Sequence, residues 1–458
     1  MSRIYETKGL WADKVALFGF LIAGLLIARF IIASKSAVVL SGPIMLDYTG
    51  LSISIPAGNG WQSEKRWKYQ DNSFVLSSVF VPGTAGPTAM SYCQYLLTES
   101  SDTPDLWFDE QAAVVSGRIV GTGQTRTGSL VFDWAQIENS EALFDMFFAT
   151  ALLPNNRQLK IEVSQTTGDT DLAEQVFRQI IENIEFEGNP ILEVGSDIVM
   201  EIKAEGLDSF FEPYFVKGSR AEVSPDSRSR RNLFVIKDAS KQAIGFVIDV
   251  LVDFASDKLL NVQAASLFYI RGRYTSEQAT FFRSDYNFDE FIWKNEISNI
   301  KGKSANEVIA GKDGVITVRG FSPQIEEKSY QSGPAAIPEV FIEFIFSKMF
   351  NRGHKEAIVD IVNADGTIIP TLISRFESED AAVVEEGVGY IFNLNPLNNP
   401  GSFQRFYLDE QMHILKILLR QENIYTLELT SEENILREFP ERADYILHGN
   451  EIFQQDQL

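Results

Sequence analysis

Residues 15–34 form a largely apolar run with a single charged side chain, Arg29, and this run constrains the chain more than any other feature. Twenty residues in a helix rise about 30 Å, which matches the hydrocarbon thickness of a bilayer. Arg29 lies about 7–8 Å from the end of such a helix, so its long side chain reaches the headgroup layer at a moderate cost. The run therefore predicts a transmembrane anchor at residues 15–34.

Charges on either side of the run indicate its orientation. Three basic residues precede it, whereas Lys35 alone follows closely. Positive charge favours the cytoplasmic side, so residues 1–14 are expected to be a cytoplasmic segment. The bulk is then extracytoplasmic, which in a bacterium is the periplasm. A cleaved signal peptide is the main alternative, since Ser34 and Ser36 offer a weak cleavage pattern, and a buried soluble helix is the third. The retained anchor is preferred because the leading segment is long and contains Glu6 and Asp13.

Small residues inside the run have a spacing that lets two helix backbones approach closely in lipid. They are Gly19, Ala23, Gly24 and Ala28. We expect them to pack against another transmembrane helix. The alternative is that Gly and Ala are simply common in spanning helices.

Charge and cysteine content exclude some classes of function. The chain has 40 basic and 63 acidic residues, a net charge of −23, and therefore repels the phosphate backbone of nucleic acid. Its one cysteine, Cys93, cannot form an internal disulfide or by itself a thiolate metal cage. We expect Cys93 to be a buried core residue.

Residues 47–188 have the order of elements of one domain. An alternating strand, GLSISIPA at 50–57, precedes Trp61, and a helix is expected at 104–117. Further strands are expected at 73–83, 129–138, 142–153 and 157–167, and a last helix at 169–187, ending in IIENIEFE. This order and these phrases resemble the PsbP-like family of α/β/α sandwich domains. The resemblance implies an extrinsic assembly or binding module rather than an enzyme, and it transfers no binding residue to this sequence.

Residues 188–190, Gly-Asn-Pro, are expected to form a boundary, after which the pattern indicates a diverged duplication. The matching segments are residues 233–253 with 357–378, 266–272 with 388–393, and 313–320 with 422–429. Each copy ends in an apolar helix. The pattern predicts two α+β subdomains, at 195–350 and 351–450, or else one continuous sheet. The fold class is therefore α+β: a transmembrane helix, a PsbP-like sandwich, then a duplicated antiparallel sheet with helices.

The two terminal helices of the copies carry distinct signals. The helix at 337–350 is apolar on nearly every side, so it is buried in a core or against a partner or membrane surface. The start of the helix at 431–447 is signalled by Thr430 and Glu433, spaced as a capping box, and Pro440 should break or kink the helix.

Residues that carry chemistry are sparse. No phosphate loop, nucleophile elbow or zinc-protease motif occurs, and the three histidines are not spaced as metal ligands. Residues 363–366, Asn-Ala-Asp-Gly, indicate a hairpin turn rather than a calcium loop. We therefore predict no catalytic, cofactor-binding or metal-ligating residue, and no cofactor.

A basic segment, Ser-Arg-Ser-Arg-Arg at 227–231, is unusual on an acidic chain. Its arginines, Arg228, Arg230 and Arg231, are candidates for binding an acidic partner or anionic headgroups. A solvated loop is the alternative.

Two functional hypotheses remain. The first is a non-catalytic, membrane-anchored extracytoplasmic protein that binds or scaffolds other proteins, or is a subunit of a larger membrane complex. The second is an anchored or secreted hydrolase that assembles a carboxylate pair from distant strands. The absence of a reactive motif favours the first hypothesis. The sequence does not indicate a small-molecule ligand.

Overall fold

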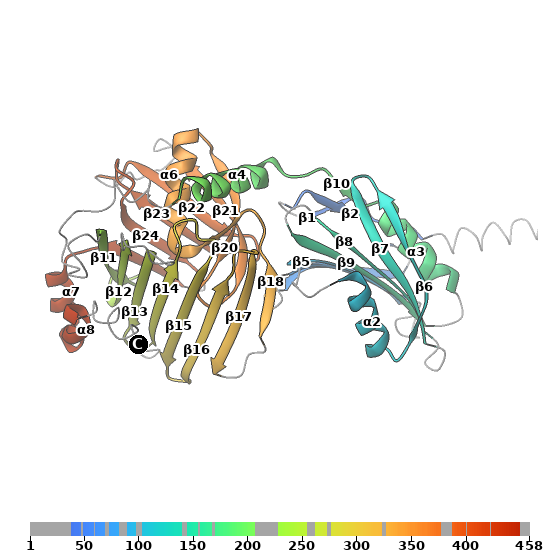
Figure 1. Ribbon diagram of the computed structural model, residues 1–458, viewed down its shortest axis with the longest axis horizontal. Coiled ribbons are helices and arrows are strands. Elements are labelled where there is room, and N and C mark those ends of the chain that lie inside the picture. Colours follow the sequence, from blue (N-terminus) through green and yellow to red (C-terminus); the bar gives the residue numbers. More distant parts are fainter. Residues whose placement is uncertain are drawn as a thin grey trace, which may run out of the picture.

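Figure 1 shows a computed structural model of the chain. The described residues are 38–46, 49–58, 60–68, 73–81, 89–97, 103–139, 144–153, 156–166, 170–206, 228–253, 262–272, 276–322, 327–376, 387–399, 401–421 and 423–448. The predicted anchor at 15–34, with its four packing residues, lies outside them. Within the described ranges, no helix has the length and hydropathy to span a membrane.

The first unit contains a seven-stranded antiparallel sheet with the order β3-β4-β5-β9-β8-β7-β6. Its strands are β3 (Trp61–Lys68), β4 (Ser73–Phe80), β5 (Ala89–Leu97), β6 (Arg118–Thr127), β7 (Leu130–Asn139), β8 (Phe144–Leu152) and β9 (Arg157–Thr166). The expected strands at 73–83, 129–138, 142–153 and 157–167 correspond to β4, β7, β8 and β9. Strands β3, β5 and β6 were not expected.

Helices cover both faces of this sheet. Helix α2 (Pro104–Val114) packs through Trp107 and Phe108 against one face. Helix α3 (Thr170–Glu182) packs through Val176 and Ile180 against the other. The apolar residues of α3 recur at helical spacing, so one stripe of the helix is buried. The unit therefore has three layers, helix, sheet and helix.

A small sheet closes the core beside α3. It consists of β1 (Ile44–Leu46), β2 (Leu51–Ile53) and β10 (Glu185–Phe186), in the order β1-β2-β10. Leu46 of β1 is buried and pairs with Leu51 of β2. The unit therefore begins before residue 47, where the sequence placed its start.

The Gly-Asn-Pro boundary begins a helix, α4 (Pro190–Glu205), that was not expected. The Asn189 side chain accepts a hydrogen bond from the backbone N–H of Ile191, and Pro190 occupies the first helical turn. Both are favourable residues for a helix start. Helix α4 packs on the second unit at strand β20, described below.

The second unit is built on one fifteen-stranded sheet, so of the two expected arrangements the structure has the continuous one. Its first meander comprises β11 (Arg228–Lys237), β12 (Ala243–Asp253), β13 (Val262–Ile270), β14 (Ser276–Ser284), β15 (Phe291–Asn299), β16 (Gly302–Ala310), β17 (Val315–Ser322) and β18 (Lys328–Gln331). The rest comprises β19 (Ala336–Pro338), β20 (Glu356–Val362), β21 (Ile368–Phe376), β22 (Tyr390–Pro396), β23 (Phe403–Leu408), β24 (Ile414–Arg420) and β25 (Ile424–Leu429).

Strands β11 and β25 join the two meanders. They pair antiparallel from Phe234–Leu429 to Lys237–Thr426. Of the segments matched in the duplication, the first pair corresponds to the hairpins β11–β12 and β20–β21, and the second pair to the strands that follow them, β13 and β22. The third pair does not correspond, because β17 is the seventh strand of the first meander and β25 is the sixth from β20. Residues far apart in the sequence therefore share one hydrogen-bonded ladder.

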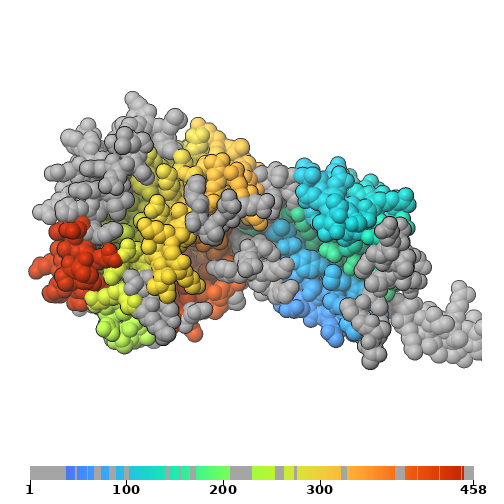
Figure 2. All heavy atoms as spheres, turned by 90° about the horizontal axis from the view of Figure 1, so that it is seen from below, coloured from blue at the N-terminus to red at the C-terminus, as the bar shows by residue number. Residues whose placement is uncertain are grey.

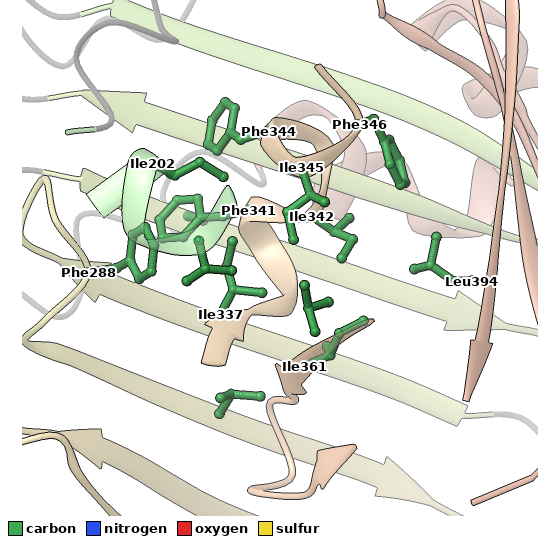
Figure 3. Close-up of a cluster of buried hydrophobic side chains, with 14 of the residues drawn as sticks. Ile202, Phe288, Ile337, Phe341, Ile342, Phe344, Ile345, Phe346, Ile361 and Leu394 are labelled. Atoms are coloured by element: carbon green, nitrogen blue, oxygen red, sulfur yellow. The ribbon is translucent and has the colours of Figure 1, made fainter. Parts of the chain in front are cut away.

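The sheet curls around a buried helix (Figure 3). Helix α6 (Ile342–Arg352) follows a short helical turn, η1 (Glu339–Phe341), and its apolar side chains meet those of both meanders. Phe346 stacks on Phe392 of β22, with ring centroids 4.6 Å apart. The apolar helix expected at 337–350 is thus a core helix, but it begins later than expected, since residues 337 and 338 belong to strand β19.

One end of the sheet turns inward. The turn between β20 and β21, at residues 363–366, approaches β17 so closely that a Cβ on Gly366 would lie 2.4 Å from a methyl carbon of Val318. The backbone φ of Gly366 is +86°, which also favours glycine. The hairpin turn predicted at these residues is confirmed.

Two helices cover the outer face of the first meander. They are α7 (Glu432–Glu438) and α8 (Ala443–His448), separated by the turn η2 (Pro440–Arg442). Helix α7 ends before Pro440, as expected for a residue without a backbone N–H. Its N-cap is Ser431, which accepts from the N–H of Asn434, rather than the expected Thr430.

The two units lie end to end along the long axis of the molecule (Figures 1 and 2). Helices α7 and α8, coloured red, are at the end away from the first unit. The described part of the chain is α+β, with mostly antiparallel strands.

Candidate ligand-binding cavity

A cavity of about 330 Å³ lies between the inner face of the curled sheet and helix α6. Strands β11 to β15 form one wall, and β23 to β25 form another. The turn η1, the start of α6 and Ala364 of the β20–β21 turn complete the lining. Residues of both meanders therefore line one partly open cavity.

Side chains along each strand point alternately to the inside and the outside of the curled sheet, and most of those that point inward to the cavity are apolar. On β12, Val247 and Leu251 point inward to the core around α6, whereas Ile248 and Val250 belong to the outer cluster under α7 and α8. Successive side chains of a strand face opposite sides, so the inner set is fixed once the register is fixed. Apolar residues of the lining include Phe234, Phe268, Trp293, Phe406, Ile414, Ile417, Leu419 and Leu427.

Arg230 of β11 reaches into this interior. Its Nη1 and Nη2 atoms donate to the two carboxylate oxygens of Glu343 on α6, each at 2.7 Å. Both side chains are more than four-fifths buried. A bidentate pair of this kind neutralises both charges and orients α6 against the sheet.

The next residue, Arg231, points to the other face. Its guanidinium bonds the carboxylate of Glu432 on α7 and the backbone carbonyl of Ile446 on α8. The segment at 228–231 therefore lies in strand β11, not in a loop. Its use by a partner stays a prediction, and Arg228 is the third candidate residue, at the start of the strand.

Asp249 stands on the inward face of β12, between Val247 and Leu251. Ser266, its partner across the strand pair, donates a hydrogen bond to it. Burial raises the pKa of Asp249 to about 6, although the Ser266 hydrogen bond and the charge of Arg230 act in the opposite direction. The charge of Glu343 raises it further. The carboxyl group is therefore desolvated and incompletely compensated.

Glu339 is the first residue of η1 and lines the same cavity. Its side chain is exposed to solvent at the cavity, although many protein atoms lie around it. Burial raises the pKa of Glu339 to about 7, and the charges of Asp365 and Asp249 raise it further. No described residue donates a hydrogen bond to this carboxylate. Two acids with raised pKa values therefore face one cavity.

A ladder of amides supports the wall beside these acids. Gln278 of β14 donates to Asn295 of β15, which donates to Asn306 of β16. Asn306 donates in turn to the backbone carbonyl of Ala364, at 2.7 Å. The ladder holds the β20–β21 turn against the inner face of the sheet.

The other residues considered from sequence lie elsewhere. Cys93 is buried in β5, as expected, and burial raises the pKa of its thiol to about 12. His354 is in a loop, and His413 lies just before β24 with Nδ1 2.9 Å from a carboxylate oxygen of Asp409. Within the described ranges, no cluster of three or more His, Cys, Asp or Glu side chains converges to hold a metal ion.

Sequence reasoning missed Asp249 and Glu339. Asp249 interrupts an otherwise apolar run on β12, and an acid at an inward position of a buried strand is a detectable signal. Glu339 gave no comparable signal, since it precedes a helix, where acids are common.

No protein family matches the sequence, and no curated protein matches it. A solved structure, the beta-barrel-like protein of the domain of unknown function DUF1849 from Brucella abortus, covers 44% of this chain and 95% of its own, with 11% sequence identity and a TM-score of 0.34. Neither fold nor function follows from a similarity this low.

Proposed function

We propose that the chain is a non-catalytic binding protein whose curled sheet holds a small, largely apolar ligand. The carrying observation is the cavity between α6 and the two meanders, whose lining combines a majority of apolar residues with nine polar or charged ones. Ligand sites commonly have this composition. A volume of about 330 Å³ is roughly twice that of an engineered cavity that binds benzene, and suits a ligand of about a dozen non-hydrogen atoms.

We also propose that residues 15–34 anchor the protein in a membrane, with residues 1–14 in the cytoplasm and the bulk outside it. The resemblance of residues 47–188 to PsbP-like domains supports a role in assembly or binding. In this proposal the protein contacts other subunits through Gly19, Ala23, Gly24 and Ala28 in the membrane. Replacing Gly19 and Gly24 together by Leu should lower the particle mass in mild detergent without unfolding the outer units. An unchanged mass contradicts this contact.

The basic segment requires a modified experiment. Arg230 and Arg231 already hold α6 and α7, so replacing them would disturb the fold as well as any partner. Arg228→Glu is therefore the variant that tests an acidic partner. A loss of co-purifying protein that is larger at low salt supports this contact, because salt screens exposed charges.

Cavity binding can be tested with a neutral probe, 4-phenyl-1-butanol, titrated into the full chain by calorimetry, with empty micelles as the blank. Ala264 of β13 lines the cavity, so Ala264→Leu should fill part of it and abolish saturable binding. The control is Ala279→Leu on β14, which adds the same atoms to a groove on the outer side of the sheet. Equal binding by both variants, or no saturable binding by the unaltered chain, overturns the proposal.

A carboxylate-dependent hydrolase remains the second candidate, since Asp249 and Glu339 share one cavity and have raised pKa values. Such values suit groups that exchange protons near neutral pH. A screen for hydrolysis of peptides, glycans and esters decides between the two. Turnover that is lost in both Asp249→Asn and Glu339→Gln establishes the hydrolase, and absence of turnover alongside probe binding supports the binding protein.

A further inference from the structure

The charges in the cavity do not balance. Arg230 is its one described basic residue, and Glu343 holds both ends of the guanidinium. Asp249 has a hydrogen bond from Ser266, whereas Glu339 has no described donor. With both acids ionised, the lining therefore carries excess negative charge next to an apolar wall. Asp249 is half-buried and Glu339 is exposed, but the two like charges share a partly desolvated cavity, so a ligand that supplies positive charge is favoured there.

Trp293 provides a second, independent indication of a ligand. It lies on the inward face of β15, lines the cavity and is almost fully buried. Its indole N–H has no acceptor in the described part of the chain. Buried donors in proteins are normally paired, so this N–H is available to an acceptor atom of a bound molecule. Aromatic rings of the lining, such as Phe234 and Phe268, can also attract a cation.

We propose that the cavity binds a small organic amine that also carries an acceptor atom for the Trp293 N–H, with its ammonium group between Asp249 and Glu339 and its apolar body along the walls of β23 to β25. This inference rests on the proposed binding function and specifies its ligand class. An ammonium has three N–H donors and can therefore bond both carboxylates at once. A neutral alcohol of the same size can donate one hydrogen bond but supplies no positive charge, and a carboxylate of the same size is repelled by both acids.

Other ligand classes fit the lining less well. An organic acid would meet Asp249 and Glu339 as like charges, and Arg230 is already neutralised by Glu343. A divalent metal ion requires several converging oxygen ligands, and no such cluster occurs among the described residues. The amine is thus favoured by charge as well as by shape.

Three probes of nearly equal shape isolate the charge: 4-phenylbutylamine, 4-phenyl-1-butanol and 4-phenylbutyrate. Each is titrated into the full chain in mild detergent at pH 8 by calorimetry, with empty micelles as the blank. We expect the amine to bind at least about tenfold more tightly than the alcohol, since hydrogen bonds to charged groups contribute that much. The butyrate should bind more weakly than both.

Two variants test whether Asp249 and Glu339 cause the preference for the amine over the alcohol. Glu339→Gln and Asp249→Asn keep the size of each side chain, and each should weaken amine binding about tenfold while leaving the alcohol unchanged. Asp365→Asn is the control: Asp365 adds negative charge near Glu339 but is exposed and does not line the cavity. It should change amine affinity much less. Circular dichroism melting confirms that each variant is folded.

Binding should also depend on pH and release protons. The groups that face the two acids are Ser266, Arg230 and Glu343 at Asp249, and Asp365 at Glu339. As pH falls from 8 to 5, the carboxyl groups with pKa values of about 7 and 6 take up protons, while the amine stays charged. Amine affinity should therefore fall, and binding at pH 7 should release protons, seen as a buffer-dependent calorimetric heat.

The outcomes distinguish failure of the proposed ligand class from failure of the proposed binding function. Equal, saturable binding of amine and alcohol overturns the ligand class but leaves the cavity as a binding site. Tighter binding of the butyrate also overturns the ligand class. If none of the three probes binds, the proposed function itself fails.

Discussion

Arg157 of strand β9 donates a hydrogen bond at 2.6 Å to the carboxylate of Asp360 on strand β20, and so joins the two units. The two side chains are 1% and 6% exposed. Beside this pair, the Asn156 amide donates to the backbone carbonyl of Ser332 at 2.8 Å. The units are therefore docked through a buried polar contact and not merely connected through α4.

Breaking this pair on one side should destabilise the chain strongly. Asp360→Ala leaves the Arg157 guanidinium buried without its counter-ion, which costs about 3–5 kcal/mol. Urea unfolding followed by tryptophan fluorescence measures the effect. The double replacement Arg157→Met with Asp360→Leu should recover most of the loss, since no charge remains buried. A loss below about 1 kcal/mol for Asp360→Ala contradicts the role of the pair.

The first unit should fold without the second. Its sheet, α2 and α3 supply a complete core, and a fragment of residues 47–187 should melt cooperatively. A fragment of residues 38–187 should be more stable by about 2 kcal/mol, because it keeps Leu46 and strand β1. Calorimetry of both fragments tests this. If neither melts cooperatively, the docking at Arg157 is needed for folding.

Gly195 should be irreplaceable on α4. A Cβ at this position would lie 1.7 Å from the carbonyl oxygen of Ile358 on β20. Gly195→Ala gains helix propensity but forces the helix from the sheet, at a net cost of about 3 kcal/mol or more. Met200→Ala on the same helix is the control, since Met200 is 48% exposed and its loss should stay within about 0.5 kcal/mol. Equal urea midpoints for the two variants contradict the close approach.

Glu339→Gln should stabilise the protein in a pH-dependent manner. The pKa of Glu339 rises from an ordinary value of 4.5 to about 7 on folding, so the folded state binds the proton more tightly. Unaltered protein therefore loses stability as pH rises from about 4.5 to 7. Relative to it, the variant should gain about 1 kcal/mol at pH 8, reduced by the accessible surface of the carboxylate, and nothing near pH 4.5. A gain that is equal at both pH values contradicts burial as the cause.

Topology follows from the charges around residues 15–34. A tag after Leu458 should be protease-accessible from the outer face, and a tag before Met1 should be protected. Arg29→Leu should stay in the membrane, because it removes a charge from the run. The reverse protection pattern would place the cavity in the cytoplasm.

The spacing of apolar residues predicted those helices and strands whose buried side chains recur at a regular period. Helix α6 was recognised because its apolar residues occupy nearly every side, and β11 and β12 because their runs alternate or are continuously apolar. Strands β3 and β6 are at the two edges of their sheet and are rich in polar residues or glycine, so no apolar period marks them. Sheet pairing, rather than local preference, makes them strands.

The residues of the candidate site could not be predicted from their spacing in the sequence. Asp249 and Glu339 belong to different elements, and they line one cavity because the turn before α6 packs between the two meanders. Joining β11 to β25 depends on contacts between residues nearly two hundred positions apart. Sequence patterns identified the hairpins on both sides but contained no information about which strand edges pair.

Arg230 and Arg231 together determine which way β11 faces. A slip of this strand by one residue would direct Arg230 at the helices outside and Arg231 into the cavity, and would reverse Phe234 and Leu233 between the two cores. Each arginine would then be separated from its present acid, Glu343 or Glu432. Two consecutive arginines with acidic partners on opposite faces therefore specify the register of β11. A shift by one residue would break both ion pairs at once.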